Sequence, residues 1–135
     1  MYQSLFKTLA GIFTQTCVKG VLIGGYAVNA HKVTRHTVDV DFLIARDDFP
    51  KLLPELKQIS YGVEHQQETF VQMSGEGLRD LDFMLSDTDT VNRIYETGDR
   101  IIIAGEEFVT PNLNNLIALK LHSIRWNPHR ELVDL

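Results

Sequence analysis

The chain of 135 residues has a formal net charge of −5, with 44% hydrophobic and 23% charged residues. This length predicts one domain, residues 1–135, with a core of its own, and the composition excludes a disordered chain and a protein that simply coats nucleic acid. No apolar run is long enough to span a bilayer and no signal-like segment opens the chain, so we expect a cytoplasmic protein. Cys17 is the only cysteine, so we expect no intramolecular disulfide.

The first third of the chain alternates helical and strand patterns. Residues 2–16 carry apolar side chains at helical spacing, which predicts a packing helix that ends at Lys19-Gly20. Cys17 on this helix is expected to be a small buried residue rather than a nucleophile. Residues 21–23 form a wholly apolar run, typical of a strand buried on both faces. The pair Gly24-Gly25 then leads into a short predicted helix over residues 26–32.

A second strand is predicted for residues 38–44, where apolar residues alternate with Asp39, Asp41 and Leu43. One face of this strand should enter the core while the other presents the acids. The later elements follow from the same two periodicities. We expect a helix over 45–59 capped by Asp47-Asp48, then strands within 61–73 that are broken near 65–68, a turn at 74–77 and a strand within 78–85. A helix over 87–95, a hairpin of 100–103 with 107–109 and a helix from 112 to about 125 should follow.

Asp39 and Asp41 are two residues apart in a predicted strand, so their side chains should share a face. Two such carboxylates repel each other unless water or a cation separates them, and a divalent metal is the economical explanation. Mg²⁺ prefers paired oxygen ligands and keeps coordination sites for water and substrate phosphates. The pattern alone is weak evidence, because a solvated sheet face looks the same.

Three further observations favour the metal site. The pair Gly24-Gly25 permits close approach of the backbone to a phosphate beside a helix N-terminus. Asp82 offers a third carboxylate on an alternating strand. Lys120 falls inside the apolar stripe of the last predicted helix, where a lysine is expected to be paired or functional. Together these residues describe a site for a metal-bound triphosphate.

A glycine pair, thirteen residues and then Asp39-Val40-Asp41 resembles the signature of the DNA polymerase β-like nucleotidyltransferase superfamily. The run from Arg35 to Ile44 further resembles the minimal nucleotidyltransferases and the AbiEii-type proteins of toxin–antitoxin systems. The resemblance is firmest over residues 20–45 and extends to Leu81-Asp82-Phe83.

The resemblance implies an α/β (α+β) fold, a mixed sheet flanked by helices, with Mg²⁺ or Mn²⁺ held by three acids. Asp80 shares a face with Asp82, but Asp82 lies between two apolar residues, as the family's third acid does. Arg35 and Thr37 are close enough to the acids to reach phosphate, and either could equally cap a loop. The implied roles are catalytic and metal-binding for Asp39, Asp41 and Asp82, and nucleotide-binding for Gly24, Gly25, Arg35, Thr37 and Lys120.

The leading interpretation is therefore an enzyme that transfers a nucleoside monophosphate from an NTP, with ATP the expected donor, to a hydroxyl of a protein, an RNA or a small molecule. The alternative is a non-catalytic nucleotide-binding or partner-binding component of a toxin–antitoxin pair. Larger relatives carry a C-terminal helical domain, so a partner protein is expected if the acceptor site of this chain is incomplete.

Overall fold

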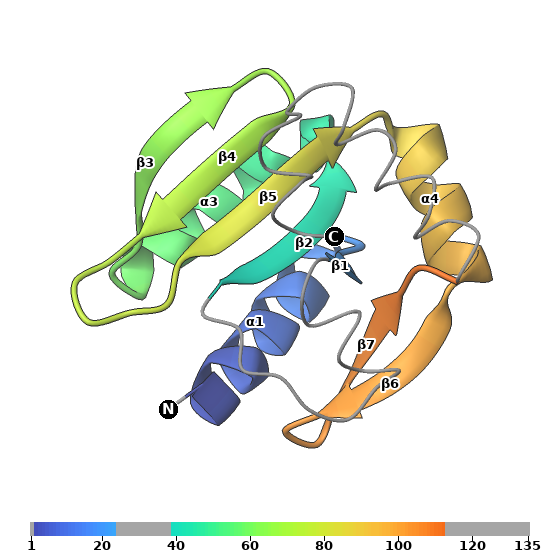
Figure 1. Ribbon diagram of the computed structural model, residues 1–135, viewed down its shortest axis with the longest axis horizontal. Coiled ribbons are helices and arrows are strands. Elements are labelled where there is room, and N and C mark those ends of the chain that lie inside the picture. Colours follow the sequence, from blue (N-terminus) through green and yellow to red (C-terminus); the bar gives the residue numbers. More distant parts are fainter. Residues whose placement is uncertain (1, 24–38, 113–135) are drawn as a thin grey trace, which may run out of the picture.

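The computed structural model describes residues 2–23 and 39–112 of the chain. Helices and strands follow one another along these residues as Figure 1 shows. In chain order the elements are α1 (Tyr2–Thr16), β1 (Val21–Ile23), β2 (Val40–Ala45), the 3₁₀ turn η1 (Arg46–Asp48), α3 (Phe49–Gln58), β3 (Gly62–Gln67), β4 (Phe70–Ser74), β5 (Leu81–Ser86), α4 (Thr88–Thr97), β6 (Asp99–Ile103) and β7 (Glu106–Thr110).

The strands form one seven-stranded sheet in the order β3-β4-β5-β2-β1-β7-β6 (Figure 1). β2 and β5 are parallel neighbours at its centre, and β1 is parallel to β7. All other neighbouring pairs are antiparallel. The predicted fold class, a mixed sheet with flanking helices, is confirmed.

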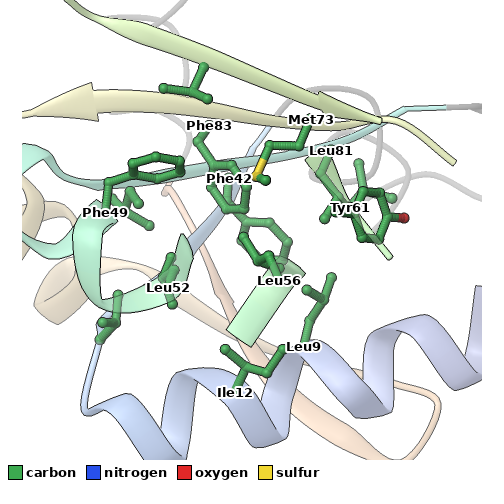
Figure 2. Close-up of a cluster of buried hydrophobic side chains, with 14 of the residues drawn as sticks. Leu9, Ile12, Phe42, Phe49, Leu52, Leu56, Tyr61, Met73, Leu81 and Phe83 are labelled. Atoms are coloured by element: carbon green, nitrogen blue, oxygen red, sulfur yellow. The ribbon is translucent and has the colours of Figure 1, made fainter. Parts of the chain in front are cut away.

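Helices α1 and α3 cover one face of the sheet. Their apolar stripes pack on the even-numbered residues of β2 and the odd-numbered residues of β5 in a single core cluster (Figure 2). Phe42 lies at its centre, with its ring centroid 4.9 Å from that of Phe13 and 6.3 Å from that of Phe83. Edge-on and offset ring contacts of this kind add to the hydrophobic stabilisation of the core.

Helix α4 covers part of the opposite face. Val91 and Ile94 pack there against a second buried cluster that includes Ile23 and Leu43. Because helices lie on both sides, all six residues of β2 are buried. The alternation of β2 therefore separates two covered faces, rather than an interior face from an open one.

Two local predictions are wrong. Asp48 occupies the N-cap position of α3, but its side chain makes no capping hydrogen bond, because residues 46–48 are already wound into a 3₁₀ turn. The Asp48 Oδ1 atom instead forms an ion pair with Lys51 Nζ at 3.1 Å. Cys17 is exposed rather than buried, since α1 ends at Thr16 and the chain turns there with a φ of 58° at Cys17.

The last described helix and hairpin agree with the sequence patterns. Asp87 caps α4 by accepting a hydrogen bond from the Thr90 N–H at 2.9 Å, and its hydrogen bonds with Thr90 lower the pKa of its carboxyl group. Ala104 and Gly105 both have positive φ, as a two-residue hairpin turn requires. Among the described residues, no helix combines the length and the hydropathy needed for a bilayer crossing. The helices predicted at 26–32 and 112–125 lie in or extend into residues outside the described ranges.

Candidate active site

The centre of the sheet brings two of the predicted acids together. Asp41 of β2 and Asp82 of β5 are in register on the parallel central strands, which lie about 4.8 Å apart in such a sheet. Leu43, two residues further along β2, belongs to the cluster under α4, so both acids project to the α4 face. Asp41 is 8% exposed and Asp82 is 5% exposed.

Asp39 lies one residue before β2 and is half-buried. The start of β2 is hydrogen-bonded to the residue before β5, because the Val40 N–H donates to the Asp80 carbonyl oxygen at 3.0 Å.

Asp80 also influences a neighbouring phenol. Burial raises the pKa of the Tyr61 phenol, the negative charge of Asp80 raises this pKa further, and Arg79 opposes the shift. Of the two acids considered for the third position, Asp82 is the one in register with Asp41.

The pair fits a divalent cation by its donor chemistry. Two carboxylates on adjacent strands supply hard oxygen ligands, and Oδ1 of each lies almost wholly out of contact with solvent. Mg²⁺ is commonly held by one or two carboxylates, with waters and substrate phosphates completing its shell. Within residues 2–23 and 39–112, no three His, Cys, Asp or Glu side chains are grouped closely enough to hold a metal. The described residues therefore offer a two-carboxylate set.

Two residues not identified from the sequence continue the row of acids. Gln72 of β4 is in register with Asp82, and His65 of β3 is in register with Gln72. The only signal in the sequence was the alternation around Gln72, which cannot reveal its strand partner. On the other side of the acids, Ile23 of β1 is in register with Asp41.

The other predicted site residues lie outside the described residues: Gly24, Gly25, Arg35, Thr37 and Lys120. Their roles stay predictions. A cavity of about 480 Å³ lies elsewhere, between the end of α1 and β7. It is lined by Cys17, Lys19 and Tyr95 among others, and of the predicted site residues that the structure describes, Asp39, Asp41 and Asp82, none lines it.

No protein-family model matches the sequence. No curated protein matches it either.

The fold is similar to that of solved nucleotidyltransferases. The antibiotic-resistance factor ANT(2″)-Ia superposes with a TM-score of 0.73 at 16% identity, over 94% of this chain and 74% of that one. The lincosamide antibiotic adenylyltransferase LnuA, solved with lincomycin bound, gives 0.68 at 18% identity, over 87% and 84%. A Thermotoga maritima protein assigned as a nucleotidyltransferase gives 0.67 at 12% identity, over 97% and 89%. The chain thus has the nucleotidyltransferase fold.

Proposed function

We propose that the protein is a magnesium-dependent nucleotidyltransferase that moves a nucleoside monophosphate from an NTP to a hydroxyl group. The observation that carries the proposal is the buried, in-register pair of Asp41 and Asp82 on the central parallel strands. The likeness of the fold to ANT(2″)-Ia and LnuA supports it.

In the proposed reaction, the acceptor oxygen forms a bond to the α-phosphorus while the bond from that phosphorus to the bridging oxygen breaks, and pyrophosphate leaves. Bound Mg²⁺ would neutralise charge on the triphosphate and lower the pKa of the attacking hydroxyl. Asp39 and Asp41 would hold the metal. Asp82 would complete the site on the acceptor side or take the proton from the hydroxyl.

The nucleotide side of the proposal rests on residues outside the described ranges. Gly24 and Gly25 would admit the phosphates against the backbone, while Arg35, Thr37 and Lys120 would contact the triphosphate. ATP is the expected donor. LnuA is a lincosamide antibiotic adenylyltransferase, and ANT(2″)-Ia has been solved in complex with adenylyl-2″-tobramycin. These two relatives in fold support a small-molecule acceptor, whereas the toxin–antitoxin role rests on the sequence resemblance.

The test is nucleotide binding by the purified protein, measured by calorimetry for each NTP with Mg²⁺, with Mn²⁺ and with EDTA. We expect binding that requires the metal and is lost in Asp41→Asn. Asp48→Asn removes an acid from the surface turn before α3 and serves as the matched control, which should bind as the wild type does. Equal nucleotide affinity in EDTA would contradict the proposal.

A further inference from the structure

One row of side chains crosses five strands on the α4 face of the sheet. From β1 to β3, each residue of the row is in register with the next. In order, the row is Ile23, Asp41, Asp82, Gln72 and His65. Residues in register on neighbouring strands share a face, so the two acids and two further polar side chains lie along one line.

Exposure is low at Ile23, Asp41 and Asp82 and rises only at Gln72 and His65. Ile23 is 7% exposed, and it belongs to the cluster that packs against Ile94 of α4, which closes the β1 side of the acids. On the other side of Asp82, Gln72 is partly exposed and His65 is exposed. Along the described row, a molecule can therefore reach Asp82 from solvent over β4 and β3.

The spacing suits a molecule of the size of a sugar ring. The Cβ atoms of Gln72 and Asp82 should lie about 5 Å apart as an antiparallel pair, and His65 is two strand spacings, roughly 10 Å, from Asp82. The amide of Gln72 makes no hydrogen bond with the part of the chain that the structure describes. It thus has two N–H donors and a carbonyl acceptor available. A hydroxyl at Asp82 would place neighbouring polar groups of the same molecule at Gln72 and His65.

The charges around this approach disfavour phosphate. Glu64 and Glu68 are exposed on either side of His65, and the Glu64 carboxylate accepts a hydrogen bond from the Ser74 hydroxyl at 2.8 Å. The nearby cationic side chain of Arg46 donates from Nε to the Glu68 carbonyl oxygen at 3.2 Å. An acceptor carrying a phosphate backbone would meet carboxylates along this edge.

We propose that Gln72 and His65 bind the acceptor, and that the acceptor is a small molecule with several hydroxyl groups and no phosphate. The inference rests on the proposed function and assigns the acceptor side of the same site. Gln72 orients the molecule beside Asp82 through its amide, and His65 contacts its far end.

The experiment uses ATP labelled at the α-phosphorus and measures transfer of the label to three acceptors. These are tobramycin, lincomycin and an RNA oligonucleotide with a free 3′ hydroxyl. Wild type, Gln72→Leu, His65→Leu and Gln66→Leu are compared, with the KM for ATP and for the acceptor measured separately. Gln66 is the matched control, because it is exposed on β3 and in register with Val71 on the opposite face.

We expect label in tobramycin or lincomycin. The KM for that acceptor should rise tenfold or more in Gln72→Leu and less in His65→Leu, while the KM for ATP stays within twofold. Gln66→Leu should match the wild type in both constants. Label on the RNA alone, label on no probe while ATP still binds, or an unchanged acceptor KM in Gln72→Leu would overturn the inference. Failure of the wild type to bind ATP with Mg²⁺ would overturn the proposed function itself, and the inference with it.

Discussion

The two faces of the sheet use the same central strands for different purposes. On the α1 and α3 face, Phe42 and Phe83 are fully buried in a continuous apolar core. On the α4 face, the residues that directly precede them, Asp41 and Asp82, stand side by side. A shift of one residue along either strand therefore exchanges a core aromatic ring for a carboxylate.

The two faces should therefore contribute differently, the apolar face to the stability of the fold and the acid face to the proposed reaction. Burial of apolar rings is favourable, whereas burial of two neighbouring carboxylates is costly unless other groups or a cation compensate for them. The apolar face must therefore supply the free energy that keeps the acids in place. Substitutions on the two faces should affect different measurements.

The largest expected effect is on the acid face. Asp82→Asn should lower the rate of nucleotide transfer by about 1,000-fold or more, equivalent to roughly 4 kcal/mol in the activation barrier. The affinity for NTP should stay within about tenfold, because Asp82 is assigned to the acceptor side. Single-turnover kinetics and calorimetry measure the two quantities. A loss of NTP binding as severe as that expected for Asp41→Asn would show that the two acids share one role.

The next effect is on the apolar face. Phe83→Ala should lower the free energy of unfolding by about 3–5 kcal/mol, because it removes a fully buried ring that packs against Phe42 and Phe49. Urea denaturation measures the change. Met84, the next residue, is only partly buried on the other face, so Met84→Ala should cost less. A larger loss from Met84→Ala would mean that the α4 face contributes more to stability than its partial cover indicates.

A smaller effect is expected at the edge of the apolar core. The Tyr61 hydroxyl donates to the Arg79 carbonyl oxygen at 2.7 Å, and Tyr61→Phe should cost about 1 kcal/mol in stability at neutral pH. Because the pKa of Tyr61 is raised in the folded state, its contribution is full below the unfolded-state pKa of about 10 and is lost as the pH rises through the folded-state pKa. Urea denaturation from pH 8 to 11 should show this loss in the wild type and a smaller one in Tyr61→Phe. Identical slopes would rule out Tyr61 as the source.

Periodicity predicted most described elements and the face of the sheet on which Asp41 and Asp82 lie. The alternation around Asp82 correctly placed Leu81 and Phe83 in the core, because a strand has a fixed two-residue repeat. Register could not be predicted in the same way. Gln72 lies beside Asp82 only because β4 pairs with β5, and no local pattern specifies that pairing. The prediction that Asp48 caps α3 failed, because the N-cap preference of a residue type does not show where a 3₁₀ turn precedes the helix.

The parallel pairing of β2 and β5 has a consequence for folding. All of α3, β3 and β4 lie between these strands in the chain, so their pairing is a long-range contact that typically forms slowly. A chain in which only the β3-β4-β5 meander had formed would contain Asp82 without Asp41 beside it. A ligand that bridges both acids would therefore bind the folded chain and not the unfolded one. At a hundred times its dissociation constant, such a ligand would add about 2.7 kcal/mol to the free energy of unfolding.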